Sequence, residues 1–398
     1  MHKLLYLTHR IPYPPNKGDK IRSYHLLKHL TKHFRVYLGA FIDDEQDWQY
    51  VDHVNSLCEE TCFVRLDPLL ARIRSFTCLF SSMPLTLPYY RSSKLGAWVN
   101  HLLAGGMINH AVIFSSAMAQ YISEKDIASS VIDYVDVDSD KWRQYALTKA
   151  WPQKWVYQRE AELLLKYETL ITKKCSSVTF VSEKEADLFK QLSPEVANKI
   201  TYFNNGVDTD FFSPDQHFVN PYKVGTKVLV FTGAMDYWPN VDAVRWFAYE
   251  LFPAVRTKIP GLEFYIVGAR PSKKVLELSA IPGVVVTGSV DDVRPYLAFS
   301  EIAIAPLRIA RGIQNKVLEA MAMEKTVVAS PQALEGITAI PGIEIFVADG
   351  VEEYINHLIS LLQNPQMEVG KAARRRVIED YNWDKNLSRI DRLLQISS

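Results

Sequence analysis

Short apolar segments alternate with helix-length segments along this chain, and that alternation limits its possible folds more than any other feature. The first apolar segment, LLYLT at 4–8, is followed by a Pro/Gly-rich loop, a helix pattern from about 19 to 33 and a second apolar segment at 36–41. Similar segments recur at 111–114, 130–133 and 177–182, each followed by a helical pattern such as 157–173. This order predicts a parallel sheet covered by helices.

The same pattern begins again after a polar, Pro-containing stretch at 213–226. Apolar strand segments then lie at 227–233, 262–268, 284–289, 302–306 and 326–330. We therefore predict an α/β protein of two doubly wound, Rossmann-like domains facing a cleft, with residues 1–214 in the first and 215–382 in the second. Residues 366–396 look like two helices, broken near Tyr381–Trp383.

In sheets of this kind, ligands bind beyond the carboxyl ends of the strands. The turns after Gly233, Gly268, Gly288 and Pro306 should therefore share one edge of the second sheet. Neither GxGxxG nor GxxxxGK[ST] follows any predicted strand, which disfavours dinucleotide oxidoreductases and P-loop NTPases.

The richest polar cluster is the stretch APLRIARGIQNKVLEAMAMEK, which begins at 305. Its loop and helix start contain Arg308, Arg311, Gly312, Gln314, Asn315 and Lys316. A helix N-terminus with a glycine loop and cations suits a phosphate, and Glu319 could accept hydrogen bonds from both ribose hydroxyls. This combination describes a nucleotide diphosphate site. The alternative is that Glu319 only favours the helix start while the arginines are solvated.

In the first half, Asp19 and Arg22 open the first helix, and four aspartates surround a strand end at 131–142. They are Asp133, Asp136, Asp138 and Asp140. A carboxylate of Asp19, Asp136 or Asp138 could activate an acceptor hydroxyl. Helix capping is the competing interpretation.

Three stretches together resemble the family 4 GT-B glycosyltransferases: FVSEKEADLF at 180–189, YFNNGVDTDFFSP at 202–214 and LEAMAMEKTVVASPQALEGI at 318–337. The segments PPNKGDKIRSYHLL, DVDSDKW and ARGIQNKVLEAMA are most similar to sugar transferases of bacterial exopolysaccharide systems. The resemblance implies a nucleotide-diphosphate sugar donor held by the second domain, an acceptor held by the first, no essential divalent metal and usually retention of configuration. It also implies a final helix, 383–398, that returns to the first domain.

By matching positions, the resemblance assigns ribose binding to Glu319 and the border of the base pocket to Gly288, Ser289 and Val290. Backbone amides of Gly312, Ile313 and Gln314 would face the sugar and phosphates, and Gly18 and Asp19 match the loop that faces the diphosphate and the acceptor.

Two positions depart from the family pattern. Arg311 stands where the family commonly has glutamate, and an arginine cannot accept a hydrogen bond from a sugar hydroxyl. The turn from Gly233 to Asn240 lacks the usual basic residues that neutralise the diphosphate. Our hypothesis is that Arg311 and Lys316, with Arg308, replace that charge; alternatively, Arg311 binds the carboxylate of a uronic acid donor.

The formal net charge is zero, which gives no indication of nucleic-acid binding. Residues 1–40 nevertheless hold eight Lys or Arg and only one acid, Asp19. The segment 69–80 interleaves Arg72 and Arg74 with large apolar residues, which suits either an ordinary packed helix or one lying on an anionic membrane. A polyprenyl-diphosphate-linked sugar is a plausible acceptor at such a surface.

The N-terminal apolar run is too short for a signal peptide, so we expect a cytoplasmic location, peripheral to the inner face of the membrane at most. We read the four cysteines as thiols and expect no metal or cofactor besides the sugar nucleotide. The rival functions are a nucleotide-sugar epimerase of the same architecture and a non-catalytic sugar-nucleotide sensor or assembly partner.

Overall fold

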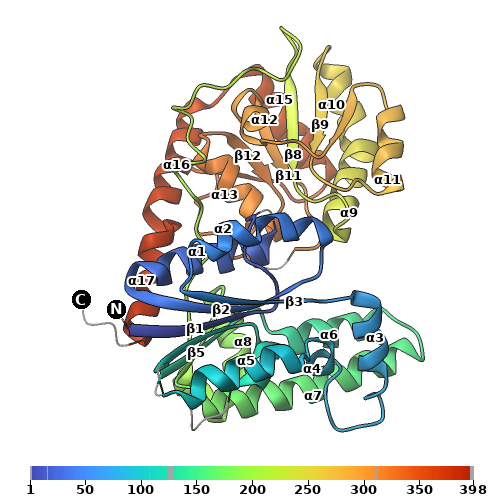
Figure 1. Cartoon of the computed structure of the whole chain (residues 1–398). Coiled ribbons are helices and arrows are strands. Elements are labelled where there is room, and N and C mark those ends of the chain that lie inside the picture. Colours follow the sequence, from blue (N-terminus) through green and yellow to red (C-terminus); the bar gives the residue numbers. More distant parts are fainter. Residues whose placement is uncertain (1, 16, 107, 123–128, 311, 395–398) are drawn as a thin grey trace. The chain divides into compact units, whose positions relative to one another are not determined.

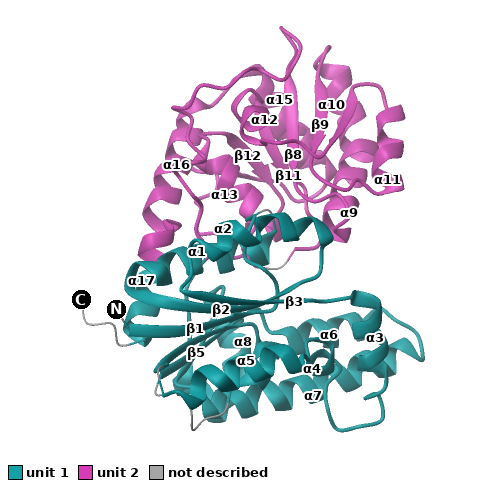
Figure 2. Ribbon diagram, in the orientation of Figure 1, with its two compact units in different colours: residues 1–204, 387–398 teal, residues 205–386 magenta. Residues whose placement is uncertain are grey.

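The structure is a computed structural model that describes residues 2–15, 17–106, 108–122, 129–310 and 312–394. The chain forms two compact units, of which unit 1 comprises residues 1–204 and 387–398 and unit 2 comprises residues 205–386 (Figure 2). Each unit contains one parallel β-sheet with helices packed around it (Figure 1). The GT-B architecture of two Rossmann-like domains, predicted from the sequence, is confirmed.

The units meet at 204/205 and 386/387 rather than at the predicted 214/215 and 382/383. The linker before unit 2 is held by unit 2 itself: Val207 N donates to Tyr381 O over 2.8 Å, and Arg374 Nη1 donates to Phe212 O over 2.9 Å. A Cβ on Gly206 would lie 2.7 Å from the Trp383 ring. No strand or helix pattern in the sequence predicts these contacts, which place residues 205–214 in unit 2.

Unit 1 has a seven-stranded sheet in the order β3-β2-β1-β4-β5-β6-β7. Its strands are β1 (His2–Thr8), β2 (Phe34–Ile42), β3 (Glu60–Arg65), β4 (His110–Phe114), β5 (Ser129–Val135), β6 (Ser177–Phe180) and β7 (Ile200–Tyr202). Its helices are α1 (Gly18–His33), α2 (Val51–Asn55), α3 (Pro68–Phe76), α4 (Thr86–Tyr89), α5 (Ser93–Ala104), α6 (Asp138–Leu147), α7 (Gln153–Lys174) and α8 (Glu183–Leu192). Figure 1 shows α1 and α2 on one face of this sheet and α5, α7 and α8 on the other. Because both faces are covered, the central strands contain continuous apolar runs rather than alternating ones, as Leu4–Leu7 of β1 illustrates.

Unit 2 has a six-stranded sheet in the order β10-β9-β8-β11-β12-β13. Its strands are β8 (Val228–Thr232), β9 (Glu263–Val267), β10 (Val284–Gly288), β11 (Ile302–Ala305), β12 (Thr326–Ala329) and β13 (Phe346–Val347). Its helices are α9 (Trp238–Trp246), α10 (Phe252–Lys258), α11 (Lys273–Leu276), α12 (Arg294–Ala298), α13 (Asn315–Ala322), α14 (Pro331–Leu334), α15 (Val351–Gln363) and α16 (Met367–Asp380). The last helix, α17 (Trp383–Leu393), begins in unit 2 and ends in unit 1.

Both sheets reverse their strand order once, between β1 and β4 in unit 1 and between β8 and β11 in unit 2. Open α/β sheets bind ligands beyond the carboxyl ends of the strands at this reversal. Each unit therefore offers one edge at which the candidate residues should be sought.

Candidate functional site

Glycines end three neighbouring strands of unit 2. Gly233 N donates to Val267 O over 3.0 Å, and Gly268 N donates to Gly288 O over 3.2 Å. A Cβ on Gly268 would lie only 1.7 Å from Gly233 O, and both residues have a φ of +152°. The backbones of the turns after β8 and β9 thus touch directly, as the sequence predicted for turns that share one edge.

The predicted phosphate loop runs from the end of β11 into α13. Gly312 has a φ of +63°, a left-handed conformation that glycine adopts without strain. Ile313 is buried in the hydrophobic core, and Gln314, the N-cap, donates from Nε2 to Gly312 O over 3.3 Å. The first amides of α13 have no preceding carbonyl within the helix, so an anion can accept their hydrogen bonds. Arg311 lies outside the described residues, so its proposed role stays a prediction.

Lys316 and Glu319 lie in the first turns of α13, and both are partly buried. Lys316 Nζ donates to Asn240 Oδ1 over 2.6 Å, and Asn240 Nδ2 donates to Ala234 O over 2.9 Å. A Cβ on Gly233 would lie 3.4 Å from Lys316 Cε, which places the lysine directly against the turn after β8. Lys316, Asn240 and Gly233, three predicted site residues, are therefore together.

Burial disfavours the charged forms of both ionisable side chains. It lowers the pKa of Lys316 to about 8, although the Glu319 carboxylate opposes this change. It raises the pKa of Glu319 to about 7, against the opposing effect of Lys316. Ionisable groups that titrate this close to neutrality are common in ligand sites.

Arg308 does not point freely at this edge. Its guanidinium forms a two-bond pair with Asp242 of α9, with Nε 2.9 Å from Oδ2, and its charge lies 5.7 Å from the Trp246 ring centre. It borders a cavity of about 270 Å³ beyond the ends of β11, β12 and β13, lined also by Leu307, Ser330 and Tyr354. The sequence grouped Arg308 with Lys316 because it could not reveal the carboxylate partner.

The turn after β9 adds a cation that the sequence reasoning missed. Arg270, with a φ of +51°, donates from Nε to Asp236 Oδ2 in the turn after β8 over 2.6 Å. Ser289 and Val290 follow β10 at the same edge, Ser289 exposed and Val290 packed against the core. A basic residue therefore lies beside the turn after β8, but Asp236 of that turn already pairs with it.

In unit 1, a polar cluster lies beyond β1 and β2. Arg10 forms a two-bond pair with Asp43, with Nε–Oδ1 2.8 Å and Nη2–Oδ2 2.7 Å, and also donates to Asp19 Oδ2. His9 Nε2 lies 3.3 Å from the same Asp19 oxygen. These hydrogen bonds and the Arg10 charge hold the pKa of Asp19 well below its usual range, despite burial. Gly18, beside it, has open space around its Cα, because a Cβ there would meet nothing within 4 Å.

Some of the buried polar atoms at this edge have no hydrogen-bond partner among the described residues. They are Thr8 Oγ1, His9 Nδ1 and Ser116 Oγ, at the ends of the adjacent strands β1 and β4. Buried polar groups without partners are uncommon and suit a ligand hydroxyl. The positions directly after the strands were the signal available for His9, Arg10 and Ser116, and our sequence reasoning did not use it.

Asp136 and Asp138 follow β5 and share one lysine. Lys141 Nζ lies 2.7 Å from Asp136 Oδ2 and 3.1 Å from Asp138 Oδ1, and these charges raise the pKa of Lys141. Nearby Glu168 is buried, and its pKa is raised by burial and by the Asp138 charge. The pair can bind a hydroxyl, but its negative charge is already balanced by Lys141.

Arg22 corrects one prediction. Its side chain is completely buried and forms a two-bond pair with Asp133, at 2.6 and 3.0 Å. It also donates to Phe203 O over 3.0 Å and stacks on the Phe203 ring at 3.7 Å. Arg22 therefore joins α1 to the strands beneath it and cannot reach a substrate. Lys20 is likewise buried, with Nζ 2.6 Å from Asp47 Oδ2, so these two cations do not contribute to a solvated basic face, whereas Lys28, Lys32 and Arg35 of the same stretch are exposed.

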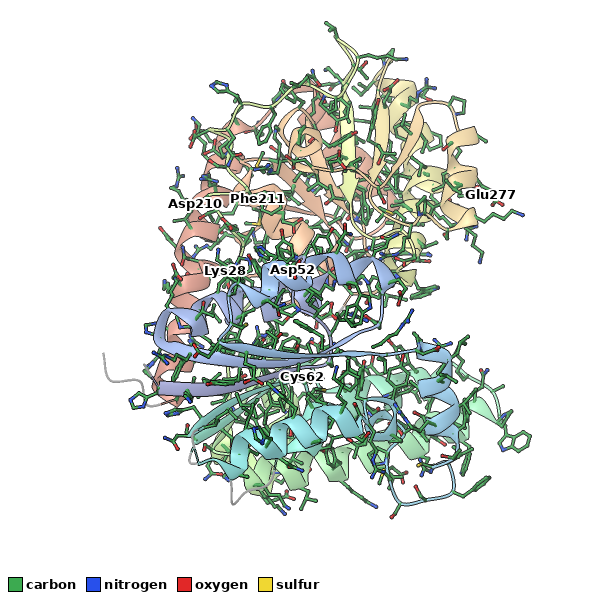
Figure 3. All side chains as sticks on the ribbon, in the orientation of Figure 1. Lys28, Asp52, Cys62, Asp210, Phe211 and Glu277 are labelled. Atoms are coloured by element: carbon green, nitrogen blue, oxygen red, sulfur yellow. The ribbon has the colours of Figure 1, made fainter. Side chains whose placement is uncertain are left out.

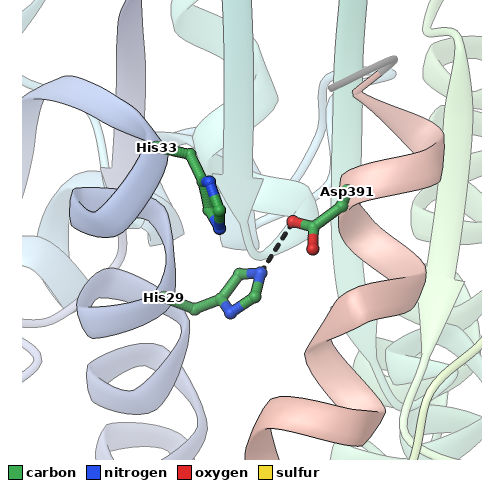
Figure 4. A group of neighbouring side chains, drawn as sticks. All are labelled: His29, His33 and Asp391. Atoms are coloured by element: carbon green, nitrogen blue, oxygen red, sulfur yellow. Dashed lines mark hydrogen bonds and ion pairs between the residues drawn. The ribbon is translucent and has the colours of Figure 1, made fainter. Parts of the chain in front are cut away.

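The described residues include one group that could hold a metal ion: His29 and His33 on α1 and Asp391 on α17 (Figure 4). Their ligand atoms lie within 4.8 Å of one another, and His29 Nε2 already forms a 2.7 Å hydrogen bond with Asp391 Oδ1. That bond attaches the end of α17 to α1 within unit 1. The cysteines are free thiols, and burial raises the pKa of Cys58 and Cys175 to about 12.

A comparison with protein families supplies the decisive observation. The family described as Glycosyl transferases group 1 matches residues 226–364, the stretch that holds the glycine edge and α13. The chain is a glycosyltransferase with the GT-B fold. Curated protein sequences gave no match.

Solved structures share this glycosyltransferase's fold at low identity. A sucrose-phosphate synthase from Thermosynechococcus elongatus aligns with a TM-score of 0.73 at 17% identity, covering 99% of this chain and 98% of that one. HepE from Anabaena in complex with UDP aligns with a TM-score of 0.68 at 14% identity, covering 99% and 100%. WaaG, a glycosyltransferase involved in lipopolysaccharide biosynthesis, aligns with a TM-score of 0.62 at 13% identity, covering 99% and 100%.

Within the described part of the glycosyltransferase, no helix combines the length and the apolar character needed to cross a bilayer.

Proposed function

We propose that this glycosyltransferase moves a sugar from a nucleotide-diphosphate donor bound to unit 2 onto a glycan or polyprenyl-diphosphate-linked acceptor bound to unit 1. The observation that supports this most is the grouping of Lys316, Glu319, Asn240 and the glycine edge within the segment that matches the family. Lys316 and the first amides of α13 offer positive charge to a diphosphate. Glu319, when ionised, offers two oxygens to the ribose hydroxyls.

The base of the donor is proposed to be uracil. HepE, which shares the fold, has been solved with UDP and with UDP-glucose. UDP-glucose is therefore the first donor to test, and UDP-glucuronate is the second because Arg311 could pair with a uronic acid carboxylate.

The leaving diphosphate must be neutralised as the glycosidic bond breaks. Lys316 is the best-placed described cation for this role, since Arg308 is paired with Asp242 and Arg270 with Asp236. Loss of such a charge costs on the order of 3 kcal/mol in the transition state. Arg311→Ala with near-normal turnover would remove Arg311 from this role.

The family resemblance supports a retaining, metal-independent transfer, and a place in bacterial exopolysaccharide biosynthesis. In a retaining transfer, the leaving phosphate can itself take the acceptor proton, so the carboxylates of unit 1 need only position the acceptor. Full activity in the presence of EDTA is the expected result. Nuclear magnetic resonance of the product would establish the anomeric configuration.

We further propose a cytoplasmic protein that associates peripherally with the inner face of the membrane, where a lipid-linked acceptor is presented.

A thermal-shift screen tests the donor site. We expect UDP or UDP-glucose at one hundred times its dissociation constant to add about 2.7 kcal/mol to the stability of wild type. Glu319→Ala should lose this gain, whereas Glu277→Ala should keep it, because Glu277 points outward from unit 2 (Figure 3). If GDP-, ADP- and CDP-sugars stabilise instead, the base assignment is wrong; if no sugar nucleotide does, the site assignment is wrong.

Two other functions predict different products. An epimerase would convert UDP-glucose to an isomeric UDP-sugar without any acceptor. A non-catalytic sensor would bind the donor and release neither UDP nor a new sugar product. Chromatography of the donor after incubation, with and without a polyprenyl-diphosphate-linked sugar, separates the three.

A further inference from the structure

One helix of unit 1 presents its large apolar residues to solvent. In α3, the small residues Ala71 and Ser75 are buried, whereas Leu69 and Ile73 are 68% and 63% exposed. Phe76 is exposed on the same helix. Helices of water-soluble proteins bury their large apolar residues, so this helix is oriented for an apolar environment outside the protein.

The orientation of α3 is fixed by hydrogen bonds. Asp67 caps the helix, accepting from Leu69 N over 2.8 Å and from Leu70 N over 3.1 Å. Arg74 donates from Nε to Pro88 O and from Nη2 to Tyr89 O, at 2.5 and 2.7 Å. The exposed apolar face is therefore held outward, and Arg74 is occupied within unit 1 rather than available to a lipid phosphate.

A second exposed apolar segment lies at the turn between α6 and α7. Trp151 is 83% exposed, and Tyr145, Leu147 and Trp155 are also exposed. Tryptophan and tyrosine prefer the interface between water and lipid, because their rings are apolar and their N–H or O–H group is polar.

The two segments form one surface. Arg159 of α7 donates from Nη2 to Cys78 O and Met83 O, each over 3.1 Å. Leu85 N donates over 2.6 Å to the next residue of α7, Glu160. The loop after α3, with Phe80 93% exposed, is thereby held against the same helix that carries Trp155 one turn earlier. Figure 1 shows α3 and the α6–α7 turn at the same end of unit 1.

The two segments that carry the exposed apolar residues contain cations and no acids. Residues 69–83 and 145–155 hold four Lys or Arg and no Asp or Glu, in a chain whose net charge is zero. Arg72, Arg91, Lys149 and Lys154 are exposed. Apolar side chains among cations match an anionic bilayer, in which the apolar groups enter the headgroup region and each cation adds about a fivefold gain in binding.

We propose that residues 69–83 and 145–155, which we call the docking surface, bind unit 1 to an anionic phospholipid membrane. This surface is the membrane contact of the peripheral association proposed above, and the inference rests on that proposed function. Binding to the membrane does not itself require the lipid-linked acceptor, which only explains its biological purpose. It moves the membrane contact away from the basic N-terminal stretch, where Lys20 and Arg22 are buried in ion pairs.

Flotation of the full chain with vesicles tests the docking surface. Wild type should float with phosphatidylcholine vesicles that contain about one third phosphatidylglycerol, and much less with phosphatidylcholine alone. Phe80→Ser with Trp151→Ser should weaken binding by about tenfold or more, because both side chains are almost fully exposed and their loss leaves the fold intact. Lys149→Glu with Lys154→Glu should weaken binding by about tenfold or more and remove the preference for anionic lipid.

The matched controls lie on unit 2. Val224→Ser removes an equally exposed apolar side chain, and Lys223→Glu with Lys258→Glu reverses two exposed charges. These variants should float as wild type does. Wild type that stays unbound, or controls that lose binding as much as the docking-surface variants, would overturn the proposal.

Two further readouts separate docking from other outcomes. All variants should keep the melting-temperature rise with UDP-glucose, so loss of that rise in wild type refutes the donor site and leaves docking unaffected. If light scattering shows a dimer of wild type that Phe80→Ser with Trp151→Ser dissolves, and wild type does not float, the surface binds a second copy and the membrane proposal is wrong.

Discussion

The two ionisable groups on α13 make a direct prediction about pH. Lys316, with a pKa of about 8, must be charged to attract a diphosphate, and Glu319, with a pKa of about 7, must be ionised to accept from ribose. We therefore expect the affinity for UDP-glucose to be highest between about pH 7 and 8. Each pH unit beyond either pKa should cost up to about tenfold, or about 1.4 kcal/mol.

The expected loss of affinity differs in cause at the two ends of the pH range. At about pH 9, roughly one tenth of Lys316 is charged, and at about pH 6, roughly one tenth of Glu319 is ionised, so affinity should fall about tenfold at each end. UDP-glucose suits the assay better than UDP, since its diphosphate has no proton to lose in this range. Isothermal titration calorimetry from about pH 5.5 to 9 measures the profile.

Two variants identify the group behind each limb of the profile. Lys316→Met should weaken binding at pH 7.5 and abolish the fall at high pH, while Glu319→Gln should abolish the fall at low pH. Glu277→Gln should leave the profile unchanged, because Glu277, which directly follows α11 in unit 2, is exposed. An affinity that stays constant from pH 6 to 9 would refute the assignment of both groups, and a Lys316→Met profile that still falls above pH 8 would refute that of Lys316.

Three further predictions concern stability. Glu319→Gln should stabilise the protein by about 1 to 3 kcal/mol at pH 8 and by little at pH 4. Burial raises the pKa of Glu319 in the folded protein to about 7, so the contribution of this carboxyl group to stability is fully present below pH 4.5 and is lost as the pH rises through 7. Arg22→Ala should cost about 3 to 5 kcal/mol in urea unfolding, since Asp133 would be left buried without its partner. Gly268→Ala should destabilise unit 2 and abolish donor binding, because its Cβ would overlap Gly233 O.

Matched substitutions check the causes. Arg35→Ala removes an exposed arginine whose nearest carboxylate, Glu59, is 3.7 Å away, and it should cost less than about 1 kcal/mol. Gly261→Ala places a Cβ in open space at a φ of +78°, so it should cost only the backbone strain, about 1 kcal/mol. If Arg22→Ala unfolds at the same urea concentration as Arg35→Ala, the buried pair does not stabilise the fold as argued.

Periodicity was sufficient to predict the central strands and the carboxyl edges of both sheets, since strands buried on two faces contain continuous apolar runs. Periodicity did not predict the edge strands β3 and β13. β3 reads ETCFVR, with polar residues at both ends, and β13 has only two residues, so neither produces a recognisable apolar run. The unit boundary was also misplaced, because single contacts such as Val207 with Tyr381 hold the linker rather than a periodic pattern.

The site was harder to predict than the fold, because a sequence does not show whether a charged side chain forms an ion pair. Arg22 and Lys316 both lie in the first turns of helices that follow strand ends. Arg22 pairs with a carboxylate of β5, whereas Lys316 Nζ donates to the Asn240 amide oxygen and lies 4.8 Å from the Phe231 ring centre. The difference lies in the residue opposite each cation, which is 111 positions away for Arg22 and 76 for Lys316. Spacing within one segment cannot report it.

Whether a cation is already paired also affects how this glycosyltransferase neutralises a diphosphate without a basic residue in the turn after β8. A cation already paired with a carboxylate gains less from a diphosphate, because it must first give up its partner. Arg308 and Arg270 are in this position. Lys316 gives up only a hydrogen bond to Asn240, and burial makes its charge costly until an anion arrives, so a diphosphate relieves that cost on binding. Asn240→Asp should therefore weaken UDP-glucose binding by supplying Lys316 with a second carboxylate, whereas Asn240→Ala, which only removes the amide oxygen, should weaken it less. The opposite order of the two affinities would mean that Lys316 does not contact the diphosphate.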